Sequence, residues 1–353
     1  MAAKSLTYHQ ELNQKKTLQL REQLKEMPAF ISGFFRALEN TSTILTRVNY
    51  ASDLKIFFQF LINEVPYFNN KTMLQITQED LKEISIDNLY LFLDYLNLYT
   101  ASDDEDPKFI ENHERGKARK VACLRSFFKY YFKKGILEQN ICQLLDTPKL
   151  HEQPIIRLES DEIHVLLDIV ESGEGLTEKQ KQYHKKVVKR DTAILILFLT
   201  TGIRVSELVS LDIKDVDFNN YTFAVTRKGG NRVILYFDEE TKSALIEYLD
   251  ERKSRGTYQT DSPLFLSMQN RRITVRAVEN MVKKYAALAA PLKKISPHKL
   301  RSTFGTMLYA ETGDIYLVAD VLGHKDVNTT RKHYAAMQED NRRLASKAIK
   351  LRK

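Results

Sequence analysis

Basic side chains that could bind a phosphate occur along the second half of this 353-residue chain. Arg204 stands in "TGIRVSEL", where Gly202 is expected to end one helix and Glu207 follows the arginine by three residues. At such a junction Arg204 can reach into a cleft while Glu207 braces it, although an ordinary surface pair is the alternative. Lys228, in the turn "TRKGGN", can swing into a groove or simply remain an exposed turn lysine.

A second basic pair occurs in "ISPHKLRSTF". Ser296 and Pro297 favour the start of a helix, which places His298 in its first turn and Arg301 on the same face. Because a helix N-terminus already attracts anions, the two side chains could form a phosphate clamp there. A capping cluster is the alternative interpretation, but the apolar stripe of this helix needs neither residue.

The stretch "LGHKDVNTTRKHYAAM" adds a histidine and a tyrosine. Gly323 is expected to end a helix and to leave His324 in the turn that follows. Asn328 is expected to cap a short helix that carries Tyr334 near its end. A tyrosine on a short amphipathic helix is most often a core residue, so the alternative to a nucleophile is a buried aromatic ring.

In order and approximate spacing, these residues resemble the signature boxes of the tyrosine recombinases, the phage integrase family, and within it the Xer branch. The matching pieces are "TGIRVSEL", "HKLR", "LGH" and the late tyrosine. The segments "TRVNYASDLKIFFQFL" and "KVACLRSFFKYYFKKGILEQN" resemble helices of the family's N-terminal core-binding domain. The basic segment 171–191 is longer than in the paired Xer recombinases and resembles the single-recombinase type.

The resemblance implies a site around the scissile phosphate of DNA. Its catalytic residues would be Arg204, Lys228, His298, Arg301, His324 and the nucleophile Tyr334, with Glu207 as a supporting acid. Tyrosine would form a covalent 3′-phosphotyrosyl link; His298 would be the base and Lys228 the acid. No metal, ATP or other cofactor is implied. One departure concerns Tyr334, which lies ten residues after His324 where many relatives have nine, and His333 fills the expected place.

The elements that must position these side chains are mostly helices. Leu54, Phe57, Phe58 and Leu61 recur with helical spacing, as do Val121, Leu124, Phe128 and Tyr131. "AILILFL" predicts a buried helix over 191–201, while "YTFAV" and "RVILYF" predict a hairpin. We therefore expect a mainly α fold with a small antiparallel β-sheet, in two domains. These are a helical DNA-binding domain over 1–147, a linker over 148–158 and an α+β catalytic domain over 159–353 with a basic tail.

Charge is concentrated rather than uniform. The net charge is +8. The segment from Lys108 to Lys134 contains nine basic residues and two acidic ones. Such a cluster is typical of a phosphate-binding surface, although a solvated helix face is the alternative. A second basic segment covers residues 341–353. The residues predicted to bind DNA are Lys117, Arg119, Lys120, Arg125, Lys129 and Lys133.

Other features limit the class of protein. Cys123 and Cys142 lack the spacing of a zinc site and are expected to be buried free thiols. No stretch approaches the roughly 20 apolar residues of a membrane span, and the start lacks a signal peptide's apolar stretch, so a cytoplasmic location is expected.

The resemblance implies a double-stranded DNA recombination site, a homotetramer on two such sites and a Holliday junction. It leaves open a DNA translocase or accessory factor as partner. Xer-type chromosome dimer resolution is favoured over the integrase or excisionase of a mobile element. Less favoured are a type IB topoisomerase, a non-catalytic DNA-binding accessory protein and a helical protein that binds RNA.

Overall fold

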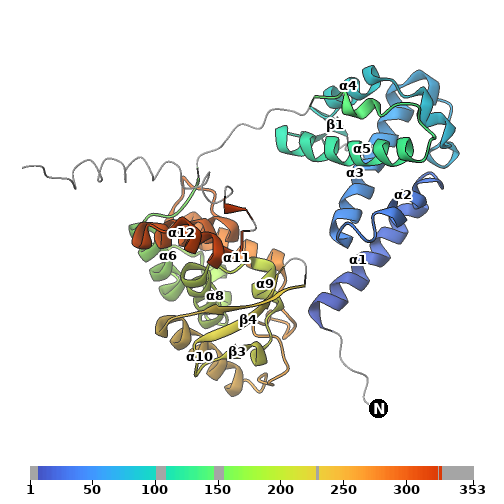
Figure 1. Cartoon of the computed structure of the whole chain (residues 1–353). Helices are drawn as coiled ribbons and strands as arrows, with labels where there is room; N and C mark the ends of the chain where they lie inside the picture. Colours follow the sequence, from blue (N-terminus) through green and yellow to red (C-terminus); the bar gives the residue numbers. More distant parts are fainter. Residues whose placement is uncertain (1–6, 101–108, 147–154, 228–229, 325, 328–353) are drawn as a thin grey trace, which may run out of the picture. The chain divides into compact units, whose positions relative to one another are not determined.

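The computed structural model describes residues 7–100, 109–146, 155–227, 230–324 and 326–327. The chain separates into two compact units, residues 1–152 and 153–353 (Figure 1). This division falls within the segment 148–158 that the sequence assigns to a linker. In the described part of the chain, no helix is both long enough and apolar enough to cross a membrane.

The first unit is built from helices and one short strand pair. Thr7, Thr43 and Ser85 accept hydrogen bonds from the first turns of α1, α3 and α4, which explains where these helices begin. Strands β1 and β2 pair antiparallel. The elements are α1 (Tyr8–Lys25), α2 (Ile31–Ala37), α3 (Ile44–Glu64), η1 (Pro66–Phe68), η2 (Met73–Gln75), η3 (Glu79–Glu83), α4 (Ile86–Tyr95), β1 (Tyr99–Thr100), β2 (Phe109–Ile110), α5 (Glu114–Lys133) and η4 (Ile141–Gln143).

Both helical stripes predicted from the sequence form the core of this unit. The four residues from α3 and the four from α5 are each at most 1% exposed. Aromatic rings join the two helices, with Phe58 and Phe127 edge to face at 6.0 Å between centroids. Cys123 and Cys142 are buried free cysteines, as expected, and burial raises the pKa of both thiols.

The second unit combines helices with a three-stranded antiparallel sheet in the order β3-β4-β5. This confirms the expected fold class. The elements are α6 (Ser160–Ser172), α7 (Glu178–His184), α8 (Val188–Thr201), α9 (Val205–Ser210), η5 (Ile213–Asp215), β3 (Val216–Asp217), β4 (Thr222–Thr226), β5 (Arg232–Tyr236), α10 (Glu239–Ser254), α11 (Val275–Ala289), α12 (Pro297–Thr312) and α13 (Ile315–Leu322).

Helix α8 is the central element of this unit, because α6, α10 and α12 all pack against it. The run "AILILFL" is at most 6% exposed at every position, so the predicted buried helix is confirmed. It begins three residues earlier than expected, at Val188, and ends at Gly202 in the left-handed conformation with φ of 60°.

The basic segment 171–191 and the start of α6 have two specific local features. The segment contains α7 between α6 and α8. Thr177 and Gln180 cap its N-terminus reciprocally, and the buried ring of His184 contacts the carbonyl of Val170 at 2.8 Å. The N-cap of α6 is Glu159, whose backbone N–H donates to the Glu162 carboxylate at 2.7 Å.

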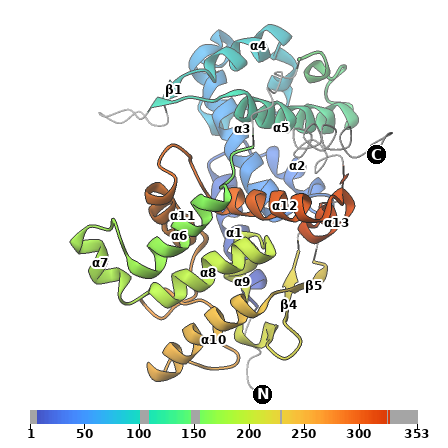
Figure 2. The same ribbon diagram turned by 90° about the vertical axis from the view of Figure 1, so that its left-hand side faces the viewer.

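Strands β4 and β5 form the hairpin that the sequence predicts. Thr226 lies opposite Arg232, so the connecting residues are 227–231. In Figure 2 the hairpin of β4 and β5 extends upward towards α13. The hairpin thus brings Arg227, which follows β4, to the C-terminal end of a helix in the same unit.

Candidate active site

Arg204 occupies the junction between α8 and α9, where it is the N-cap of α9. Glu207, one turn into α9, accepts hydrogen bonds from the Arg204 backbone at 3.0 Å and from its guanidinium at 2.8 Å. Glu207 is only 3% exposed. The acid is therefore buried while the Arg204 side chain stays partly exposed, so this is not an ordinary surface ion pair.

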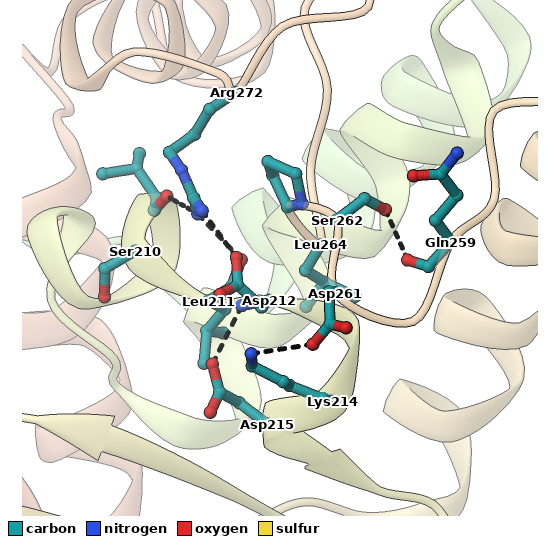
Figure 3. Close-up of polar contacts among 12 residues, drawn as sticks. Ser210, Leu211, Asp212, Lys214, Asp215, Gln259, Asp261, Ser262, Leu264 and Arg272 are labelled. Atoms are coloured by element: carbon teal, nitrogen blue, oxygen red, sulfur yellow. Dashed lines mark hydrogen bonds and ion pairs between the residues drawn. The ribbon is translucent and has the colours of Figure 1, made fainter. Parts of the chain in front are cut away.

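The opposite end of α9 is also held by an arginine (Figure 3). Arg272 donates to the carbonyls of Val209 at 2.9 Å and Leu211 at 3.1 Å, and to the Asp212 carboxylate at 2.5 Å. A cation at the last carbonyls of a helix stabilises its C-terminal end. With Glu207 at one end and Arg272 at the other, the short helix that positions Arg204 is fixed at both termini.

Arg301 lies in α12, which begins at Pro297 after the N-cap Ser296, as predicted. Its side chain is buried, and its guanidinium donates to the carbonyls of Gly202 and Leu322. His298 lies in the first turn of the same helix, one turn before Arg301, with an exposed side chain. The helical spacing that relates the two residues is therefore as the sequence predicts.

Gly323 ends α13 with φ of 61°. The backbone N–H of Gly323 donates to Asp320 and that of His324 donates to Ala319, at 2.8 and 2.9 Å. These two bonds close the helix end in the manner of a left-handed C-cap. His324 is half-buried in the turn that follows, where the sequence places it.

Two of the predicted residues, Arg204 and Arg301, meet at the end of α13. Arg204 donates to the carbonyls of Leu322 and Gly323, each at 3.1 Å, and Arg301 donates to the same Leu322 carbonyl. Two guanidiniums from different elements thus meet beside the turn that carries His324. A guanidinium holds its five N–H donors in one rigid plane, so these contacts also fix the orientation of both side chains.

A third arginine, not anticipated from the sequence, reaches the same helix end. Arg227 follows β4 directly and donates to the carbonyl of Val321 at 2.8 Å. Burial lowers the pKa of Arg227, an effect opposed by the nearby charge of Glu207. The sequence offered one signal, since Arg227 is the neighbour of Lys228 in "TRKGGN".

Two predicted catalytic residues, Lys228 and Tyr334, lie outside the described residues, as does the short helix expected after Asn328. Their roles therefore stay predictions. Within the described ranges, no group of three or more His, Cys, Asp or Glu side chains could hold a metal ion.

The residues predicted to bind DNA all lie on α5 in the first unit. Lys129 and Lys133 are exposed. Lys117 donates to Asn97 at 2.5 Å, Arg119 pairs with the buried Asp53, and Arg125 donates to the carbonyl of Leu145 at 2.5 Å. These three side chains are therefore partly engaged within the unit.

Lys120 requires a correction. Its side chain is buried, with 3% exposed, and its ammonium donates to Asn112 at 2.8 Å and lies 3.8 Å from Asp53. In this structure the ammonium is held by a carboxylate and an amide and is not presented to a phosphate at the surface, so we remove Lys120 from the predicted DNA-binding residues. The helical stripe explains its position, because Lys120 lies one turn before the core residue Leu124 on the same side of α5.

Comparisons with known proteins give a consistent result for most of the chain. The model of the phage integrase family matches residues 157–341. The tyrosine recombinase XerC of Caldanaerobacter subterraneus subsp. tengcongensis is 31% identical over 329 residues, which cover 90% of this chain and 85% of the relative. The tyrosine recombinase XerS of Lactococcus lactis subsp. cremoris is 27% identical over 94% of this chain and 98% of the relative.

The fold also matches solved structures. A site-specific recombinase XerH, bound to a palindromic difH substrate in a post-cleavage complex, superimposes with a TM-score of 0.64 at 21% identity. The match covers 94% of this chain and 88% of the XerH chain. At this identity the comparison establishes the shared fold.

Proposed function

Because this chain belongs to the phage integrase family and is a site-specific tyrosine recombinase, we propose that it cuts and rejoins DNA through a 3′-phosphotyrosyl intermediate and a Holliday junction. The observation that carries the proposal is that Arg204 and Arg301 donate to the same carbonyl, that of Leu322, beside His324. Family membership defines the class of reaction, and this convergence supports a site in the second unit.

Arg204, Arg301 and His324 would surround the scissile phosphate. The charge on the nonbridging oxygens of a phosphodiester grows in the transition state, and fixed donors stabilise that charge without having to reorganise. The support for this role is that both guanidiniums are oriented before DNA binds, Arg204 by Glu207 and Arg301 by the carbonyl of Gly202.

Tyr334 would be the nucleophile. Its phenolic oxygen attacks the phosphorus, the bond to the 5′-oxygen breaks, and a phosphotyrosyl bond retains the bond energy for rejoining. His298 would accept the phenolic proton, and Lys228 would give a proton to the leaving 5′-oxygen. The same steps in reverse, with the 5′-hydroxyl of the partner strand as nucleophile, rejoin the DNA and return the tyrosine.

The two units would have different roles on DNA. We assign the first unit to duplex binding, with Lys129 and Lys133 on α5 facing phosphates, and the second unit to catalysis. Four copies on two double-stranded sites would exchange strands in pairs. The role we favour is Xer-type chromosome dimer resolution, which is supported by XerC and XerS relatives that match most of the chain.

The test captures covalent adducts and does not require a known target site. The protein is incubated with sheared chromosomal DNA of the source organism, washed under denaturing conditions, and the attached DNA is sequenced. A Tyr334→Phe variant is the matched control. We expect one chromosomal locus with inverted half-sites to be enriched with the wild-type protein and not with the variant.

Each different outcome changes a different part of the proposal. Enrichment of the ends of a mobile element would replace dimer resolution by integration or excision. An adduct that survives in Tyr334→Phe would assign the nucleophile to another tyrosine. Tight, salt-dependent binding without any adduct would contradict catalysis and favour a non-catalytic accessory protein.

A further inference from the structure

Arg227 bridges two elements that are distant in the sequence. Its backbone N–H donates to the carbonyl of Asn231 at 2.8 Å, and its own carbonyl accepts from Gly230 at 3.0 Å, so it is fixed within the β4–β5 hairpin. Its side chain crosses to α13, where it donates to the carbonyl of Val321 at 2.8 Å. The hairpin and the end of α13 are therefore joined through one guanidinium.

The contact depends on a glycine at the end of α13. Gly323 has φ of 61°, in the region that favours glycine, and a β carbon built at this position would collide with the guanidinium of Arg227. The guanidinium therefore lies directly against the backbone of the turn that leads to His324. Glycine is needed at position 323 both for the backbone conformation and for the space that Arg227 occupies.

The guanidinium of Arg227 is held by backbone carbonyls. Its two terminal nitrogens donate to Val321 at 2.8 Å and to Asp320 at 3.5 Å, and its Nε is buried without a hydrogen-bond partner among the described residues. The carbonyls at the end of α13 carry the partial negative charge of the helix dipole and attract the guanidinium there. Arg204 and Arg301 donate to the next carbonyl along, that of Leu322. Three guanidiniums thus hold one helix end from three elements.

We propose that Arg227 is a positioning residue of the recombination reaction, an inference that rests on the proposed function. It connects the end of β4 to the turn at Gly323 and His324, and so fixes the position of this turn relative to Arg204 and Arg301. Arg227 acts through the turn rather than by touching the scissile phosphate. Its removal should slow cleavage while leaving the affinity for DNA nearly unchanged.

The first measurement does not need DNA. Hydrogen exchange at the amides of Gly323 and His324 is compared in the wild type, Arg227→Ala and Arg232→Ala. Arg232 is a matched control, because it lies on the same hairpin, carries the same charge and pairs with Asp215 at the surface. We expect about tenfold faster exchange in Arg227→Ala only, since local opening reports the loss of contacts at that site.

The second measurement is single-turnover cleavage of a nicked duplex that carries the captured site, together with the Kd for that duplex. Misplacing a reacting group by about 1 Å can cost about 10²-fold in rate, so we expect roughly 10- to 100-fold slower adduct formation at saturating DNA for Arg227→Ala. Arg227→Lys keeps the charge but not the planar fork and should recover only part of the rate. Arg232→Ala should retain the wild-type rate at saturating DNA.

Unchanged exchange or unchanged cleavage in Arg227→Ala would overturn the proposal. A weaker Kd with a normal rate at saturation would overturn it as well, because Arg227 would then be a DNA contact. If Arg227→Ala fails to fold, Arg227→Lys is judged by the same two measurements. If the wild type forms no adduct, the proposed function fails and the link to catalysis fails with it, while the exchange result still decides whether Arg227 holds the turn.

Discussion

The carboxylate of Glu207 holds Arg204 at two points, the backbone N–H at 3.0 Å and the guanidinium at 2.8 Å. Glu207 is 3% exposed, whereas the side chain of Arg204 is 35% exposed. One buried acid thus fixes both the start of α9 and the direction of the arginine. This arrangement makes the orientation of Arg204 depend on a residue that would not itself touch DNA.

Replacing Glu207 with glutamine should impair both stability and cleavage. The amide keeps one acceptor but turns an N–H₂ group towards the donors of Arg204, and an unsatisfied buried polar group costs about 1–3 kcal/mol. We expect a loss of this size in urea unfolding and about 10- to 100-fold slower adduct formation, because Arg204 loses its orientation. Glu240→Gln, at an exposed position in α10, is the control and should change neither quantity.

Gly202 offers a second test of how the site is packed. Its φ is 60°, and an added β carbon would collide with the ring of Phe304 and lie 3.0 Å from Leu322. Gly313 has a similar φ of 63° but nothing within 4 Å of an added β carbon. We expect Gly313→Ala to cost about 1–2 kcal/mol in urea unfolding from backbone strain alone. Gly202→Ala should lower the free energy of unfolding clearly more than Gly313→Ala does. Equal losses in the two variants would contradict the packing of Gly202 against Phe304 and Leu322.

The sequence predicted the framework of the site better than its contacts. Helical periodicity and terminal signals such as Ser296, Pro297 and Gly323 placed α12 and the end of α13 correctly, because these signals act within a few residues. The contact of Arg227 with Val321 was not predictable in the same way, since it depends on how a hairpin packs against a helix. The burial of Lys120 was missed because a basic residue was assigned to the surface by its charge alone.

Asp80 should make the stability of the first unit depend on pH. Burial raises its pKa, but hydrogen bonds from Lys71, Thr77 and Tyr67 outweigh this effect and lower the pKa from 3.8 to about 2. Because the folded state has the lower pKa, the stabilisation is present above the unfolded value and is lost as pH falls towards 2. Asp80→Asn should therefore remove about 2 kcal/mol at neutral pH.

Hydrogen exchange of peptides from α3 in the full chain, measured between about pH 2 and pH 7, checks this expectation. In the Asp80→Asn variant, the stability of the first unit should depend less on pH over the acidic part of the range. Asp87→Asn, at an exposed position in α4, should change stability by less than about 0.5 kcal/mol. An equal pH dependence in Asp80→Asn and the wild type would show that other carboxylates determine acid stability.

The two kinds of lysine on α5 should behave differently in DNA binding. Lys129 is exposed, whereas Lys120 is 3% exposed and donates to Asn112. If Lys129 contacts a phosphate, Lys129→Ala should weaken binding and reduce the slope of log Kd against log salt by about 1. Lys120→Met should leave this slope unchanged and lower the stability of the first unit instead, because Asp53 loses a nearby cation. A reduced slope in Lys120→Met would mean that Lys120 leaves its buried position when DNA binds.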